Sequence, residues 1–199
     1  GGEFDRGTGI SAAIDLSWQT SSYESAYTTS DPGTYDSTTL YGSARGAVAI
    51  GGGVDLTLGV DGRRDTAATR YSPTSEPAFD TGVSQFGGYL GAAWTHERAE
   101  IAATGRLDRH QEFGEATTGR LAAAWFALPD SLKLRAAAST GFKAPTLYQL
   151  YHVEPFYSNG NPDLDPEDSL SYEAGFDWTV TEGIELSATA FRIEVDDQI

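Results

Sequence analysis

The chain has 199 residues, and its 29 acidic and 13 basic side chains give a formal net charge of -16 at pH 7. This balance argues against a nucleic-acid partner, because binding to phosphates needs clustered Lys and Arg. The absence of Cys excludes a disulfide scaffold and a thiolate metal site, and it suits a chain that crosses an oxidising compartment. The chain contains no Met and no charged, apolar leader before Gly1, so we expect a mature piece or a fragment of a longer protein.

Polar and apolar residues alternate through most of the chain, which predicts β-strands with one apolar and one polar face. In chain order the apolar faces fall within residues 10–18, 40–50, 54–60, 86–94, 101–107, 121–125, 132–138, 170–178 and 186–190. This gives about nine strands of roughly 9–14 residues, longer than the usual strand of about five or six. A transmembrane helix is not indicated, because there is no run of about 18 apolar residues. Strands of a membrane barrel escape such a scan, since they show only half their residues to lipid.

The connections between the predicted strands alternate in length. Short turns are predicted at residues 51–52, 95–98, 129–130 and 181–183, and longer connections at 20–37, 67–81 and 143–168, with a brief one at 111–115. Short turns at one end and mostly long loops at the other are typical of an outer-membrane barrel. A soluble β-sandwich, such as a carbohydrate-binding domain, is the alternative. It explains the alternation, but not strands this long or polar faces this charged.

All four tryptophans lie on predicted apolar faces near a strand end: Trp94, Trp125 and Trp178 near short turns, and Trp18 near the opposite end. Indole prefers the membrane interface, so these residues are predicted to form a membrane-interface girdle. About nine strands is an odd number, whereas bacterial single-chain barrels close with an even number, and unpaired edges are costly in lipid. The predicted fold is therefore all-β, an antiparallel transmembrane β-barrel segment belonging to a larger barrel.

One stretch interrupts the alternation. The sequence elements G-F-K-A-P, L-Y-Q-L-Y, G-N-P-D-L-D-P-E and S-L-S-Y-E follow one another between residues 141 and 173. Their motif residues are Gly141, Phe142, Lys143, Pro145, Gly160, Asn161, Pro162, Pro166 and Glu167. This arrangement resembles a hallmark region of the TonB-dependent outer-membrane receptors, nearest to the cobalamin and siderophore receptor branch. The resemblance extends over residues 54–199 and is generic over residues 1–53.

The resemblance implies a barrel of about 22 strands, plugged by an N-terminal domain, in the outer membrane of a Gram-negative cell envelope. It also implies uptake of a scarce metal chelate, cobalamin or a ferric siderophore, with energy from the inner-membrane TonB complex. Residues 1–199 would form one partial barrel domain, without the plug domain and the C-terminal strands, in contact with outer-membrane lipid. We expect no enzymatic activity. A non-transporting surface barrel, acting as an adhesin or a phage receptor, is the alternative with the same fold.

The residues of the motif explain the interruption without the resemblance. Pro145 lacks a ladder donor and favours an extended Ala144, so it ends the strand. The prolines that follow favour turns that return the chain to the barrel. Aromatic rings are thereby brought near the mouth, where a loop tyrosine offers a rigid face and a hydroxyl at low entropic cost. The candidate ligand contacts, for which loop packing is the alternative, are Tyr23, Tyr27, Tyr35, Tyr71, Tyr148, Tyr151 and Tyr157.

Two further clusters suggest chemistry. Hard cations prefer grouped carboxylates, which makes the acidic turn a candidate calcium site, although it lacks the glycine and terminal Glu of a recognised calcium loop. Its members are Asp163, Asp165, Glu167 and Asp168. Asp108 and His110 share a predicted polar face and would suit the carboxylate–imidazole pair of a barrel hydrolase, whereas a polar wall facing the lumen is the interpretation we favour. Charges that alternate in sign on successive polar faces predict a ladder along this wall: Asp61, Arg106, Arg120, Arg135 and Glu173.

Overall fold

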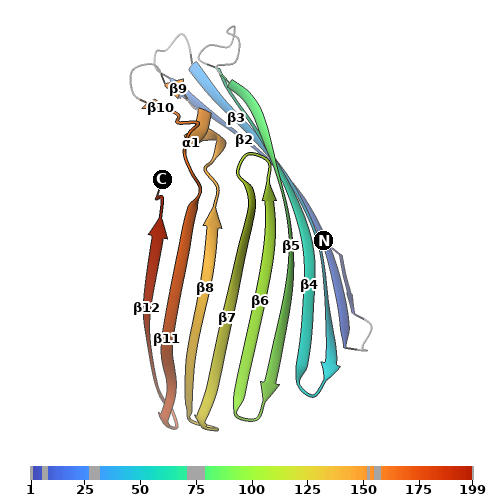
Figure 1. The fold of residues 1–199 in the computed structure, drawn as a ribbon, viewed down its shortest axis with the longest axis vertical. Coiled ribbons are helices and arrows are strands. Elements are labelled where there is room, and N and C mark those ends of the chain that lie inside the picture. The colour runs from blue at the N-terminus through green and yellow to red at the C-terminus, as the bar shows by residue number, and fades with distance from the viewer. Residues whose placement is uncertain are drawn as a thin grey trace.

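The structure, a computed structural model, describes residues 2–5, 9–26, 32–70, 79–151, 153–154 and 158–198. Its main feature is one antiparallel sheet of ten strands, in the order β1-β2-β3-β4-β5-β6-β7-β8-β11-β12 (Figure 1). The strands are β1 (Gly2–Asp5), β2 (Ile10–Ala26), β3 (Pro32–Gly51), β4 (Val54–Arg70), β5 (Phe79–His96), β6 (Ala99–His110), β7 (Gly114–Leu128), β8 (Leu132–Lys143), β11 (Glu167–Thr181) and β12 (Ile184–Asp196). Between β8 and β11 lie α1 (Leu147–Tyr151) and the small pair β9 (Val153–Glu154) and β10 (Ser158–Asn159).

The prediction of an all-β antiparallel fold with nine long strands is confirmed, since every strand of the sheet except β1 has 12 residues or more. The short turns fall where they were expected, and Gly52, Gly53 and Gly183 adopt the positive φ angles that tight turns require. These turns lie at one end of the sheet, called the turn end, at the bottom of Figure 1. The other end, called the loop end, holds α1.

Two of the predicted long connections are shorter in the structure. β2 continues to Ala26 and β3 begins at Pro32, and the next pair of strands extends to Arg70 and from Phe79. The prediction ended these strands where apolar alternation stopped, but backbone pairing continues beyond the apolar residues. A strand above the apolar band has no need of an apolar face, so its sequence shows no alternation there.

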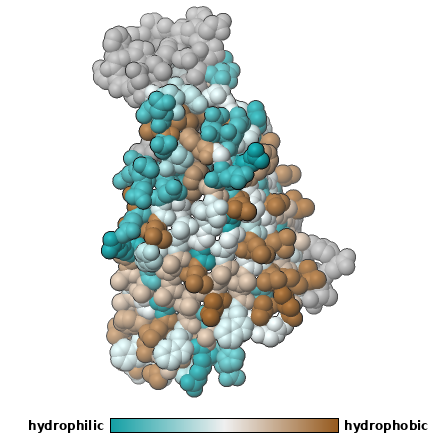
Figure 2. Space-filling model, in the orientation of Figure 1, coloured by the Kyte–Doolittle hydropathy of each residue, from teal (hydrophilic) through white to brown (hydrophobic). Residues whose placement is uncertain are grey.

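The two faces of the sheet differ in chemistry. Leu58 and Leu90 are register partners on one face, and their side chains are 56% and 62% exposed. This outer face has an apolar band, whereas the opposite, inner face holds ion pairs and hydrogen-bonded polar groups. Figure 2 shows hydrophilic side chains gathered toward the loop end and hydrophobic ones over the lower part of the molecule. A soluble sandwich would bury the apolar band under a second sheet, and the described residues place no such layer on it.

The described residues form one buried apolar cluster, which lies beneath α1 and not between layers of the sheet. Among these residues α1 is the only helix, and no helix is long and apolar enough to cross a membrane.

Candidate functional site

A short helix folds over the inner face of the sheet at the loop end. Leu147 of α1 is buried with Ala67 of β4 and Val83 of β5, and Tyr35 and Tyr151 pack against this cluster. The cluster lies on the side of the sheet opposite the apolar band, so α1 covers part of the space that the inner face borders. This arrangement, called the α1 cluster below, is the candidate ligand-binding site.

A reciprocal capping box begins α1. The backbone N–H of Gln149 donates to Thr146 Oγ1 at 3.2 Å, while Gln149 Oε1 accepts from the Thr146 backbone N–H and hydroxyl at 2.9 and 2.8 Å. Leu150 N–H donates to the Thr146 carbonyl at 3.1 Å, and Pro145 is buried just before the cap. The T-x-x-Q pattern is a readable signal of a helix start, and strand alternation does not reveal it.

The second half of the motif returns the chain beside the end of α1. Asn161 N–H donates to the Gln149 carbonyl at 2.9 Å, and its side-chain oxygen accepts from the Asp163 backbone N–H at 3.0 Å. A Cβ at Gly160 would lie 2.6 Å from the Leu150 carbonyl oxygen, a distance that real Cβ atoms do not adopt. Gly160 is thus required by close backbone approach, and the asparagine forms an Asx turn.

The other motif residues lie at the strand ends that flank this loop. Lys143 Nζ binds Glu167 Oε1 at 3.0 Å, joining register partners on β8 and β11. A Cβ at Gly141 would lie 2.6 Å from Ser169 Oγ on the same inner face. Phe142 belongs to the outer face, opposite Asp168 in the register. The motif therefore joins the two sides of the β8–β11 connection at two places. Lys143 and Glu167 pair where the strands end, and Asn161 bonds to Gln149 beside α1.

The structure brings three of the seven candidate tyrosines together. The rings of Tyr35 and Tyr148 meet edge to face with centroids 5.6 Å apart, and Tyr151 packs on the same cluster. Burial, followed by the neighbouring Tyr148 and then Asp65, raises the pKa of the Tyr35 phenol above its usual value. Tyr148 keeps 46% of its surface exposed.

The remaining tyrosines fall in different places. The prediction that Tyr23 and Tyr35 lie in a loop is wrong, because they are register partners on β2 and β3. Tyr23 is 66% exposed. Tyr27, Tyr71 and Tyr157 lie outside the described residues.

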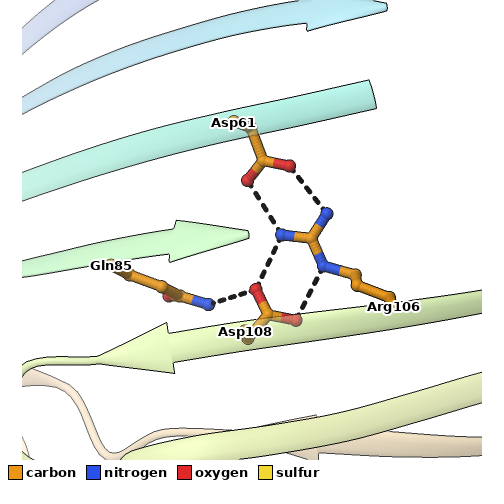
Figure 3. A network of polar contacts seen from close by, with 4 residues as sticks. All are labelled: Asp61, Gln85, Arg106 and Asp108. Carbon is orange, nitrogen blue, oxygen red and sulfur yellow. Dashed lines mark hydrogen bonds and ion pairs between the residues drawn. The ribbon is translucent and has the colours of Figure 1, made fainter. Parts of the chain in front are cut away.

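A second site, a network of polar side chains, lies on the inner face nearer the turn end than the α1 cluster (Figure 3). The Arg106 guanidinium donates to Asp61 through Nη1 and Nη2 at 2.6 and 2.8 Å, and to Asp108 through Nε and Nη2, both at 2.7 Å. Gln85 Nε2 also donates to Asp108, at 3.1 Å. Register places Gly87 between the two aspartates, and a Cβ there would overlap the guanidinium. Gly87 of β5 therefore leaves room for the Arg106 side chain, which starts on β6 and crosses β5 to reach Asp61 on β4.

Further ion pairs extend along the inner face, as the charge ladder predicts. Arg120 binds Glu173 at 2.7 Å, and Arg135 binds Asp177 at 3.2 Å. Arg135 also donates to Thr189 Oγ1, which ties β12 to the same wall. Sequence alternation indicated the sign pattern but missed Asp108, Asp177 and Gln85 as partners, because their distances depend on register between strands.

The structure does not form the carboxylate–imidazole pair considered for Asp108 and His110. Both side chains are buried, but Asp108 binds Arg106 and Gln85. His110 Nδ1 accepts from the backbone N–H groups of Glu112 and Phe113 at 3.2 and 3.4 Å, so it caps the β6–β7 turn. These hydrogen bonds stabilise the turn between β6 and β7, which is a structural role for His110.

The candidate calcium ligands are not gathered. Glu167 is paired with Lys143, while Asp163, Asp165 and Asp168 are exposed. Across the part of the chain that the structure describes, no three acidic or histidine side chains form a group that could hold a metal ion. Calcium binding here stays a prediction without geometric support.

The four tryptophans lie at the two ends of the apolar band. Trp94, Trp125 and Trp178 are near the turn end on the outer face, paired in register with Ile101, Leu134 and Leu186 respectively. Trp18 is opposite Leu40 toward the loop end. Each indole is exposed, and contact with the membrane interface stays a prediction.

Comparison with known proteins adds a family to this geometry. A family model described as TonB dependent receptor-like, beta-barrel, matches residues 2–199. Over 147 residues the chain is 32% identical to the vitamin B12 transporter BtuB of Photobacterium profundum, covering 74% of this chain and 23% of that protein. Over 153 residues it is 28% identical to an iron-regulated outer membrane virulence protein of Vibrio cholerae, covering 72% of this chain and 23% of that protein. The chain thus spans about a quarter of the length of these curated relatives.

The fold is also shared with solved structures. The siderophore receptor PirA of Acinetobacter baumannii superposes with a TM-score of 0.76 at 18% identity, covering 98% of this chain and 34% of that chain. This likeness concerns the fold alone. With the family match over nearly every residue, the chain belongs to the TonB-dependent receptors, and its strands are part of a β-barrel of the Gram-negative outer membrane.

Proposed function

We propose that the protein containing this chain imports a scarce metal chelate, cobalamin or a ferric siderophore, across the outer membrane with energy from the TonB complex. The observation that carries this proposal is the pair of unlike faces, an apolar band outside and an ion-paired wall inside, within a chain of this family. Such a wall borders a polar lumen, through which a hydrophilic cargo can pass.

The names of the relatives support the class of cargo. One relative is called a vitamin B12 transporter, and another is called an iron-regulated outer membrane virulence protein. Cobalamin and ferric siderophores share a metal held in a large organic chelate. A broad, partly aromatic surface suits such a cargo, because it offers contact area at low entropic cost.

The α1 cluster is the proposed first contact. Tyr148 is half exposed, held edge to face by Tyr35, and its helix is fixed by the capping box. A ring held in this way loses little freedom when it meets a ligand. Tyr23 stands on the inner face of β2 and is a second candidate.

Two partners follow from the proposal. The complete protein would carry an N-terminal plug domain within the lumen, against the ion-paired inner wall, and would receive energy through it from TonB. The outer face would contact membrane lipid. Reading the gene on both sides of residues 1–199 tests this directly, since a plug domain upstream and further alternating strands downstream are expected.

Uptake in cells tests the function itself. Cells that lack the receptor gene are supplied with the intact gene and given either ⁵⁷Co-labelled cobalamin or a ⁵⁵Fe-labelled siderophore. We expect one label to accumulate, and accumulation to stop when the tonB gene is deleted. Binding without accumulation in either strain would instead favour a non-transporting surface barrel. A His110→Ala variant is expected to retain uptake, because His110 caps a turn.

A further inference from the structure

The outer face carries a groove that the transport proposal does not use. Its volume is about 690 Å³, within the range of roughly 300–1,000 Å³ that is typical of ligand pockets. Gly62 and Gly88 line it where neighbouring strands carry the larger Phe86 and Leu107. Gly42 is the register partner of Gly62, and the side chains of Leu16 and Phe86 lie over these two glycines, whereas the position of Gly88 is open. The result is an apolar hollow in the band that faces lipid.

The positively charged side chain of Arg109 lines the loop end of this groove. Arg109 is exposed and is the register partner of Phe86 on one side and Glu115 on the other. Among the described residues its guanidinium has no ion pair, although Glu115 also lines the groove. The inner-face residues Arg106 and Arg120, by contrast, are both bound to carboxylates.

We propose that this groove is a specific site for one lipid molecule of the outer leaflet, with an acyl chain in the hollow and a headgroup phosphate at Arg109. The apolar lining faces hydrocarbon, and a chain lying in the hollow contacts more protein surface than one on a flat wall. An arginine at the edge of the hydrocarbon region lies at the level of lipid headgroups, where each cation attracts anionic lipid. The loop end is the extracellular end of such barrels, which selects the outer leaflet.

The occupant is a lipid and not another protein because the groove lies within the apolar band. Its walls include Leu16, Val60 and Leu107, all of which belong to outward-facing rows. The cargo that the receptor imports plays no part in this argument. Loss of lipid binding and loss of uptake are therefore separate results.

Native mass spectrometry of the intact receptor tests the proposal. The receptor is purified in detergent and incubated with phosphorylated lipid A or with its dephosphorylated form, and the bound fraction is measured. Wild type is expected to retain one phosphorylated lipid A molecule. Arg109→Gln should lower that retention by about fivefold while leaving the dephosphorylated form unchanged, as expected for loss of one cation near a headgroup. Glu115→Gln should raise it, since a nearby carboxylate repels phosphate.

A second pair of variants tests the hollow. A Cβ at Gly88 meets its nearest atoms at 3.8 Å, so the backbone there has room for a side chain, and Gly88→Leu would project that side chain into the groove. Gly105 lies on the outer face opposite Leu90, outside the groove, and a Cβ there meets nothing within 4 Å. Gly88→Leu should abolish retention of both lipids, whereas Gly105→Leu should not. Equal retention by all variants, or equal loss in both glycine variants, would overturn the proposal. Heat-modified electrophoretic mobility of each variant checks that its barrel has folded.

Discussion

The outer and inner faces of the sheet are built from the same strands but are stabilised in opposite ways. On the outer face, Leu58 and Leu90 are more than half exposed, and none of the residues that the structure describes forms a second layer over them. On the inner face, Arg106 is bound to carboxylates on two strands. Adjacent residues of one strand therefore meet different surroundings, and a slip of one residue would exchange them. In this sheet an apolar side chain indicates the outer face and an ion-paired side chain indicates the inner face. Burial within the chain does not separate the two faces, because apolar residues of the outer face are themselves exposed.

The largest expected effect comes from a charge on the outer face. Leu58 stands near the middle of the apolar band, so Leu58→Arg should lower the free energy of unfolding of the intact receptor by about 2–4 kcal/mol. Thr57→Arg places the same side chain one residue away, on the inner face, and should change it by less than about 1 kcal/mol. Denaturant titration of receptor folded into phospholipid vesicles measures both. Equal losses would contradict the assignment of the two faces.

The next effect concerns the inner face. Arg106→Ala leaves Asp61 and Asp108 facing each other without their cation, and we expect a loss of about 2 kcal/mol in the free energy of unfolding. Arg120→Ala breaks an ion pair whose side chains are half exposed, and its expected loss is below about 1 kcal/mol. The same titration compares them. A larger loss for Arg120→Ala would show that the network of Figure 3 is not the stronger one.

A smaller effect is expected at the loop. Gly160→Ala forces the chain away from the Leu150 carbonyl, and should loosen α1 by about 1 kcal/mol. Hydrogen exchange of the α1 amides in the intact receptor should accelerate accordingly. Gly105→Ala is the matched control, because its new Cβ meets no atom within 4 Å. Unchanged exchange in Gly160→Ala would mean that the close approach does not hold the helix.

The smallest effect is on binding. Tyr148→Ala should weaken binding of the imported chelate about fivefold, which corresponds to roughly 1 kcal/mol. Tyr172→Ala removes a similarly exposed ring, 47% against 46%, but from the outer face, and should leave the dissociation constant unchanged. Isothermal titration of the purified receptor gives both constants. If only the outer-face variant binds more weakly, the α1 cluster is not the contact.

The strands, the turns and the two faces were predictable because successive residues of a barrel strand face lipid and the polar lumen in turn. The sequence therefore alternates between apolar and polar residues along each strand. The upper parts of β2 and β3 were not, since above the apolar band neither face requires apolar residues. The helix α1 is too short for a helical period, although Thr146 and Gln149 gave its capping signal.

The polar sites were predictable only in outline. The signs of Asp61 and Arg106 indicated a ladder, but their contact joins residues 45 positions apart and passes over Gly87. Such a contact depends on the register of three strands, which alternation within one strand does not determine. The same limit explains why Asp108 and His110 looked like a pair although each has other partners.

The most direct test of the two-faced wall is a cysteine scan along β4 in the intact receptor. Residues 1–199 contain no Cys, so once any cysteine elsewhere in the receptor is replaced by Ser, a single cysteine at each of residues 54–62 can carry a spin label. In lipid vesicles, oxygen accessibility should peak at Leu56, Leu58 and Val60, and accessibility to a water-soluble nickel complex should peak at the residues between them. Accessibility that does not alternate, or a nickel maximum at Leu58, would contradict a strand with lipid on one side and a polar lumen on the other.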